Sequence, residues 1–184
     1  MEQLQASLQS LIDKSEIREL VQLFCRAADR KDIELMRSLY HEGATDDHGA
    51  FFSGLASEFF EQLPAIQQSM LILHHNITSH IIALDGDRAE GEVYVIAFHQ
   101  VKTESGPMDL LIGGRYLDRY ERKSGQWKFS HRSVLADWVH SNEPSLVNLD
   151  HPLVKGSHIG EGGPDDPSYR LLAMMPRGSW PVNA

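Results

Sequence analysis

The chain has 184 residues, 41% of them hydrophobic, with one cysteine and a formal net charge of −9 at pH 7. This length favours one domain that can bury a core and a pocket, while the single cysteine excludes an intrachain disulfide. The scattered basic residues and the lack of a long apolar run argue against nucleic acid and membrane as partners, so we expect a cytoplasmic protein.

Helical periodicity dominates the first third of the chain. Apolar residues recur at intervals of three and four from Glu16 to Asp29, which predicts an amphipathic helix that ends at Asp29. Asp29 lies on the edge of the apolar stripe, so we expect it to face the rest of the protein. Asp32 can cap a second short helix, and Glu58 to Met70 is expected to form a third. Glu42 to Ser53 is predicted to form a turn and a short strand.

The middle of the chain contains runs rich in valine, isoleucine and tyrosine, separated by turn sequences. Asp85-Gly86-Asp87 is a strong hairpin signal between the first two runs. Consecutive antiparallel strands behind a helical first third describe an α+β sheet with helices packed on one face. The predicted strands are Leu71 to Leu84, Ala89 to Thr103, Asp109 to Arg122 and Gln126 to Val139.

The last stretch, residues 141–184, is rich in proline and glycine and has no sustained periodicity. Its leucines and valines make it more apolar than an ordinary disordered linker. We expect one domain over residues 1–140, followed by an irregular C-terminal extension over residues 141–184. This extension is predicted to wrap over its own domain or over a neighbouring subunit.

Asp29 and His75 form the strongest chemical pair in the chain. Side chains alternate along a strand, and the phase of His75 contains Leu73 and Ile77, which places His75 on the covered face unless a bulge near Asn76 reverses the phase. A histidine that takes a proton, with a carboxylate that fixes its tautomer, can perform proton abstraction without a cofactor. The alternative is that His75 is a hydrogen-bonded histidine of the core.

Further polar residues could border the same pocket. Tyr40 and His48 flank a turn, and either can instead be a surface or packing residue. Tyr94 and His99 have the same ambiguity on the second strand. We take Tyr40, His48 and Tyr94 as candidate substrate-binding residues.

His131 and Arg132 are neighbours on the last predicted strand, so only one of them should enter a pocket. Arg132 could steady a phenolate, an enolate or a carboxylate. It could equally form an ion pair with Asp118 or Asp137. Both His131 and Arg132 are kept as candidate substrate-binding residues.

Motifs for other chemistries are missing. The histidines include neither a His-x-His strand pair nor an H-E-x-x-H helix, which argues against a metal site. The sequence has no Gly-x-Ser-x-Gly elbow, no Gly-x-Gly-x-x-Gly loop and no Walker-type loop. We therefore expect neither a metal nor a nucleotide cofactor.

Short segments in a fixed order carry a family resemblance: Asp-Arg-Lys-Asp (29–32), Leu-Tyr-His-Glu-Gly-Ala (39–44), Asp-Asp-His-Gly (46–49), Asp-Gly-Asp-Arg-Ala (85–89), Gly-Gly-Arg-Tyr-Leu-Asp-Arg-Tyr (113–120) and Trp-Lys-Phe-Ser-His-Arg (127–132). Their order and spacing resemble the SnoaL-like family of the nuclear transport factor 2-like superfamily. The resemblance covers roughly residues 10–140.

The resemblance implies a cone-shaped α+β barrel, in which N-terminal helices pack in a curved, mostly antiparallel sheet around a deep pocket. Asp29 and His75 match the helix aspartate and the strand histidine that dehydratases and a dehydrochlorinase of this family use without a cofactor. Phe24 stands where some relatives have a polar residue, one helical turn before the aspartate, and we take it as a further candidate substrate-binding residue. Relatives are often trimers or dimers, so a homo-oligomer is expected.

Together, the residues and the resemblance predict a cofactor-independent lyase. A small hydroxylated aromatic or polycyclic substrate is expected to lose water, halide or a one-carbon aldehyde after proton abstraction. Two alternatives stay open on the same pocket. One is an isomerase or a polyketide-cyclase-type enzyme, which returns the proton, and the other is a non-catalytic small-ligand-binding module.

Overall fold

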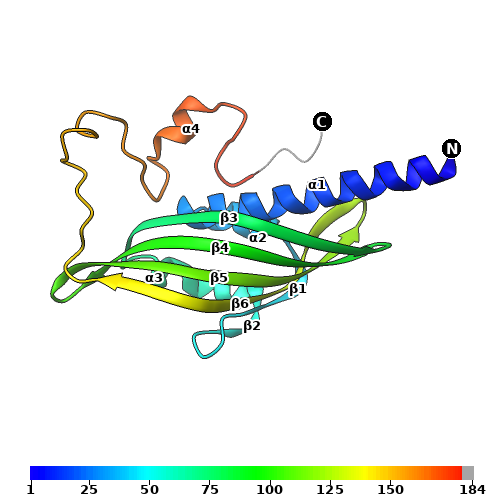
Figure 1. Ribbon diagram of the computed structural model, residues 1–184, viewed down its shortest axis with the longest axis horizontal. Coiled ribbons are helices and arrows are strands. Elements are labelled where there is room, and N and C mark those ends of the chain that lie inside the picture. Colours follow the sequence, from blue (N-terminus) through cyan, green and yellow to red (C-terminus); the bar gives the residue numbers. More distant parts are fainter. Residues whose placement is uncertain (180–184) are drawn as a thin grey trace.

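The computed structural model describes residues 1–179, and residues 180–184, the end of the predicted C-terminal extension, lie outside the described residues. Six strands form one curved sheet, with helices on its inner side (Figure 1). The helices are α1 (Glu2–Asp29), α2 (Ile33–Ser38), α3 (Ala56–Ile66) and α4 (Pro167–Leu171). The strands are β1 (Tyr40–Asp47), β2 (Ser53–Leu55), β3 (Met70–Asp85), β4 (Arg88–Thr103), β5 (Gly106–Lys123) and β6 (Gln126–Asn142).

The strand order in the sheet is β2-β1-β6-β5-β4-β3. Strand β1 runs parallel to β6, and the other neighbouring pairs are antiparallel. The predicted class, an α+β fold with N-terminal helices packed in a curved and mostly antiparallel sheet, is therefore confirmed. The segment predicted as a turn with a short strand instead supplies the full strand β1, because its backbone pairs with both β2 and β6.

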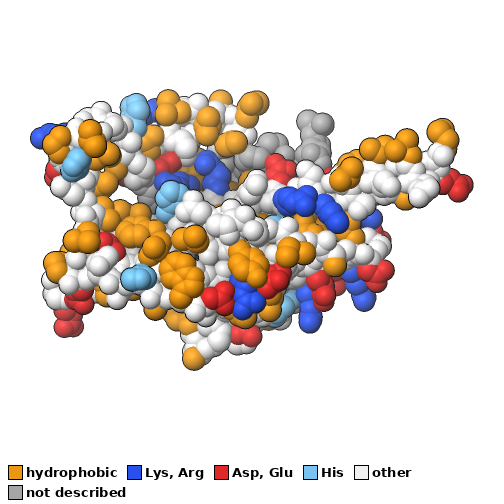
Figure 2. Space-filling model, in the orientation of Figure 1, with side chains coloured by type: hydrophobic (Ala, Val, Ile, Leu, Met, Phe, Trp, Pro, Cys, Tyr) orange, Lys and Arg blue, Asp and Glu red, His pale blue; other side chains and the backbone are white. Residues whose placement is uncertain are grey.

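Helix α1 begins at Glu2 and includes the amphipathic stretch predicted from Glu16 to Asp29. Its C-terminal half buries Ile17 and Val21 in the core. Its N-terminal half projects beyond the sheet and leaves apolar side chains such as Leu8 exposed (Figure 2). None of the described helices is long and apolar enough to cross a membrane.

A bulge interrupts the simple alternation along β3. The register of β3 against β4 shifts between Ile77 and Ser79. Leu73 is buried before the bulge and Ile82 is buried after it, whereas Ile81 is 64% exposed. The single phase predicted for the whole strand is therefore wrong beyond Ile77, because an extra residue in the bulge reverses the side chains that follow.

The C-terminal extension lies over the end of α1 (Figure 1). Arg30 Nη1 is 2.6 Å from Asp166 Oδ2, and Arg26 Nη2 donates to Ser168 Oγ over 3.2 Å. Tyr169 donates a hydrogen bond to Asp32, the residue that caps α2. These contacts place the part of the extension around Asp166 and Tyr169 against its own chain, close to the candidate Asp29. The domain boundary near residue 140 stays a prediction.

Candidate active site

A cavity of about 200 Å³ lies between the inner face of the sheet and helices α1, α2 and α3. Aromatic and aliphatic side chains form most of its wall, among them Phe24, Phe59 and Tyr116. Such a wall suits an apolar ligand, with a few polar groups to orient it. The polar side chains that line it are His48, Gln67, His75 and His99.

His75 lines this cavity, and it contacts Asp29, which lines a neighbouring pocket together with His75. His75 Nδ1 lies 2.6 Å from Asp29 Oδ1, and the backbone N–H of His75 donates to Asp29 Oδ2 over 3.1 Å. Both side chains are nearly buried, with exposed fractions of 11% for His75 and 10% for Asp29. Because a carboxylate only accepts, Nδ1 carries the hydrogen and Nε2 keeps its lone pair. The arrangement leaves a positioned base at Nε2.

Helix and strand geometry explain why the two residues meet. Asp29 is the last residue of α1, where a negative charge is disfavoured by the partial negative charge of the helix end. Two hydrogen bonds from His75 offset that cost. His75 reaches the inner face because the bulge of β3 follows it in the chain, so the predicted phase holds up to this residue.

A second histidine lies beside the base. His99 Nε2, from β4, is 3.4 Å from His75 Nε2. Burial, followed by the nearby charge of His75, lowers the pKa of His99 to about 4. His99 is therefore a neutral imidazole at pH 7, and its N–H can donate to His75 or to a substrate oxygen.

On β4, His99 faces this cavity, whereas the candidate Tyr94 faces away from it. Inward positions of β4 include Val93, Val95 and Ala97, which are buried, and His99 continues the same alternation. Tyr94 is 41% exposed on the opposite face. The alternation of small apolar residues before His99 was the signal in the sequence that could have identified it.

The third histidine of the cavity, His48, follows β1. Its Nε2 lies 3.0 Å from Oδ1 of Asp46, a fully buried carboxylate. Tyr40 does not line the cavity but donates to Asp46 Oδ2 over 3.1 Å. Burial and then the Asp46 charge raise the pKa of Tyr40 well above its ordinary value, so it stays a neutral phenol.

Arg132 lies behind the cavity wall rather than in it. It is fully buried and donates two hydrogen bonds of 2.7 Å to Asp118, one of the two ion-pair partners that the sequence suggested. Its guanidinium carbon is 4.0 Å from the ring centre of Phe24 and 4.2 Å from that of Tyr116. Arg132 thus supports two cavity residues, including the predicted Phe24, and does not reach the cavity itself.

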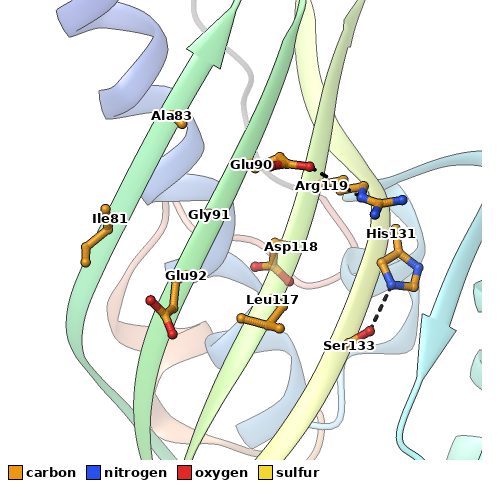
Figure 3. Close-up of a pocket in the computed structure, with 10 residues that line it drawn as sticks. All are labelled: Ile81, Ala83, Glu90, Gly91, Glu92, Leu117, Asp118, Arg119, His131 and Ser133. Carbon is orange, nitrogen blue, oxygen red and sulfur yellow. Dashed lines mark hydrogen bonds and ion pairs between the residues drawn. The ribbon is translucent and has the colours of Figure 1, made fainter.

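His131 and Tyr94 lie on the outer face of the sheet, away from the inner cavity. His131 lines a second, outer cavity of about 440 Å³, where its ring contacts Ser133 (Figure 3). Its other ring nitrogen contacts Thr45. Charged side chains line this outer cavity, and an ion pair joins Glu90 and Arg119 there. The structure does not bring Tyr94 or His131 to His75. Side chains alternate along a strand, and both residues stand at positions that face the outer side of the sheet.

Two other chemistries find little support in residues 1–179. Burial raises the pKa of the Cys25 thiol to about 12, which leaves it protonated and a poor nucleophile. The described residues contain no group of three or more His, Cys, Asp or Glu side chains that could hold a metal ion.

Known proteins share this fold. A Kribbella flavida protein, Kfla4162, is 26% identical, with a TM-score of 0.65 over 71% of this chain and 95% of its own. A putative scytalone dehydratase from Novosphingobium aromaticivorans is 19% identical, with a TM-score of 0.67 over 77% of this chain and 95% of its own. A hexachlorocyclohexane dehydrochlorinase from Novosphingobium barchaimii is 18% identical, with a TM-score of 0.69 over 77% and 98%.

No curated protein sequence matches the chain. The neighbours in structure include a dehydrochlorinase and a putative dehydratase, so the fold is one that small-molecule-processing enzymes use. Residues 9–133 match the SnoaL-like domain, a match that spans more than half of the chain. The chain therefore belongs to the SnoaL-like family, within the nuclear transport factor 2-like superfamily.

Proposed function

We propose that this protein is a cofactor-independent lyase in which His75 is the general base and Asp29 positions it. The observation that carries the proposal is the 2.6 Å contact between Asp29 Oδ1 and Nδ1 of His75, whose side chain lines an apolar cavity. Asp29 holds the imidazole in the tautomer that exposes Nε2, and it stabilises the imidazolium that forms when Nε2 takes a proton.

The proposed reaction is an elimination. His75 Nε2 removes an acidic C–H proton, the electron pair of that bond forms a double bond, and a leaving group on the next carbon departs with its own electron pair. A halide leaves in this way, and a hydroxyl group leaves as water once it has gained a proton. In a retro-aldol variant, His75 removes an O–H proton and the electron pair of that bond forms the carbonyl of a one-carbon aldehyde. The C–C bond breaks, and its electron pair stays on the other fragment as an enolate that is protonated afterwards.

His99 contributes a second polar contact in this proposal. Its neutral N–H, 3.4 Å from His75 Nε2, is placed to donate to the oxygen on which negative charge develops. General base catalysis supplies a factor on the order of 10²–10⁴, so such contacts must provide much of the remaining acceleration. The aromatic wall that includes Phe24 and Phe59 supports an aromatic or polycyclic substrate.

Product mass tests the proposal directly. Purified protein would be incubated with hydroxylated aromatic, diaryl and steroid compounds, without added metal or nucleotide, and the products weighed by mass spectrometry. A product lighter by water, hydrogen halide or formaldehyde supports a lyase, whereas a product of unchanged mass supports an isomerase or a cyclase.

His75→Gln and His74→Gln provide the matched comparison for that assay. The two histidines are neighbours on β3, but His74 is exposed and does not line the cavity of His75 and His99. Turnover that survives His75→Gln would contradict the proposal. Binding of a panel compound without any turnover would favour a ligand-binding module.

A further inference from the structure

A second histidine–aspartate pair faces the same cavity from another wall. His48 lies between β1 and β2, whereas His75 belongs to β3, at the opposite edge of the sheet. Both imidazoles line the one cavity of about 200 Å³. A substrate that fills this cavity would therefore have an imidazole on two sides.

The carboxylate beside His48 is held firmly. Asp46 is fully buried on β1, and Tyr40 donates a hydrogen bond to its Oδ2. Its Oδ1 lies 3.0 Å from His48 Nε2, but the two atoms are not aligned as a hydrogen bond. Neither atom has another hydrogen-bond partner within the described part of the chain. A buried carboxylate in this position can orient the imidazole of His48.

Aromatic side chains flank His48 at the cavity. Its ring centre is 4.5 Å from that of Phe59 and 6.2 Å from that of Phe51, and both phenylalanines line the cavity. The exposed fraction of its side chain is 19%. A leaving group that departs into such an apolar site cannot take a proton from bulk water, so a poor leaving group needs a donor in the wall.

We propose that His48 is the general acid that protonates the leaving group, with Asp46 as its positioning residue. This inference rests on the proposed lyase function and adds the second half of the proton transfer. His75 gains the C–H proton, the C–X bond breaks with its electron pair on X, and imidazolium His48 gives a proton to X. The electron pair of the C–H bond forms the new double bond, so the products are the unsaturated compound and HX. His75 then loses its proton to solvent, and His48 regains one from solvent.

This role restricts the substrate class. A halide departs as a stable anion without a proton, so a second imidazole would be of little use for it. Hydroxide, alkoxide and unactivated phenolate are poor leaving groups that depart as neutral molecules. The His48–Asp46 pair therefore points to substrates whose leaving group is bound through oxygen.

A matched pair of aryloxy ketones tests this role. The probes are 4-(4-nitrophenoxy)butan-2-one and 4-(4-methoxyphenoxy)butan-2-one, which share the acidic C–H and differ in whether the phenolate needs a proton to leave. We expect His48→Gln to lower kcat/KM for the methoxy ketone on the order of 10²-fold and for the nitro ketone by less than about threefold. His41→Gln on β1, whose ring contacts the carbonyl oxygen of Glu121, is the control variant and should leave both rates unchanged.

The outcomes separate this inference from the proposed function. In one outcome, His75→Gln abolishes release of both phenols, and His48→Gln either slows both releases equally or slows neither. His48 then has a packing or binding role, and the inference fails while the lyase function stands. If the wild-type protein releases neither phenol, or His75→Gln has no effect, the lyase function fails and the inference fails with it. Circular dichroism melting of His48→Gln shows whether a uniform loss reflects unfolding.

Discussion

The two histidine–aspartate pairs of the cavity differ in how the chain holds them. His75 and Asp29 come from a long strand and a long helix, and they are 2.6 Å apart with a second hydrogen bond through the backbone. His48 and Asp46 are two residues apart in sequence, and their 3.0 Å contact is not aligned as a hydrogen bond. Regular elements hold both residues of the first pair, whereas in the second pair only Asp46 belongs to a strand and His48 lies in the loop that follows it.

The largest expected effect is the loss of the base. His75→Gln should lower kcat by on the order of 10³-fold, because a glutamine amide keeps the polar contact but cannot accept the proton. The assay is the release of phenol from the nitro ketone, with His74→Gln as the control. A His75→Gln variant that keeps more than about a third of the activity would show that the better-aligned pair is structural.

Removal of the charge on Asp29 should have the next largest effect. Asp29→Asn keeps the shape of the side chain but can present an N–H to His75, which favours the wrong tautomer of the imidazole. We expect kcat to fall by on the order of 10²-fold and KM to change little. A rise in KM of the same size, with kcat unchanged, would mean that Asp29 serves substrate binding.

The corresponding change at the second pair, Asp46→Asn, should affect only the methoxy ketone. Its effect should be smaller than that of His48→Gln, since the imidazole remains and only its orientation and charge lose support. A fall of about tenfold for the methoxy ketone is the expected result. Because Asp46 also binds Tyr40, the melting temperature of the variant must be measured alongside the rates.

The neutral histidines make stability depend on pH. Burial lowers the pKa of both His99 and His80 to about 4, so each is neutral when folded and takes a proton near its ordinary pKa of 6.5 when unfolded. The unfolded state thus binds more protons between about pH 6.5 and 4, and the free energy of unfolding falls as the pH falls through that window. Urea unfolding at pH 7 and pH 5 should show a loss of about 1–2 kcal/mol from His99.

His80 serves as the matched control for His99, because it has the same pKa shift but does not line the cavity. Each glutamine variant should reduce the dependence of stability on pH, but only His99→Gln should slow turnover. If His80→Gln slowed turnover as much, the position of His99 beside His75 would have no catalytic meaning.

The sequence could predict the first pair because each residue follows from a local period. The helical repeat places Asp29 at the edge of an apolar stripe, and the strand repeat places His75 on the inner face. The fold followed from the same periods together with the hairpin turn at Asp85-Gly86-Asp87. These features depend on residues within about one element length of each other.

The rest of the site depends on information that no local period contains. The bulge after Ile77 reverses the faces to which the side chains from Ser79 onward point, and no residue type in that run marks the bulge. The ion pair of Arg132 and Asp118 joins β6 to β5, so the exclusion of Arg132 from the cavity depends on sheet register. The contact of His48 with Asp46 depends on a turn conformation rather than on a repeat.

The smallest expected effect concerns the C-terminal extension, which packs beside the first pair but not the second. Asp166 accepts hydrogen bonds from Arg30, from the Glu161 backbone and from the Ser168 backbone. These bonds outweigh burial and hold the pKa of Asp166 well below its ordinary value. Asp166→Asn should loosen the extension from the end of α1.

Loosening of this contact should make residues 143–179 more sensitive to limited proteolysis and should reduce kcat only a few-fold, because Asp29 keeps both bonds to His75. The reduction should be the same for the nitro and the methoxy ketones, since none of residues 143–179 lines the cavity that His48 faces. A loss confined to the methoxy ketone would instead tie the extension to the second pair. That result would contradict the proposal that only His48 and Asp46 respond to the leaving group.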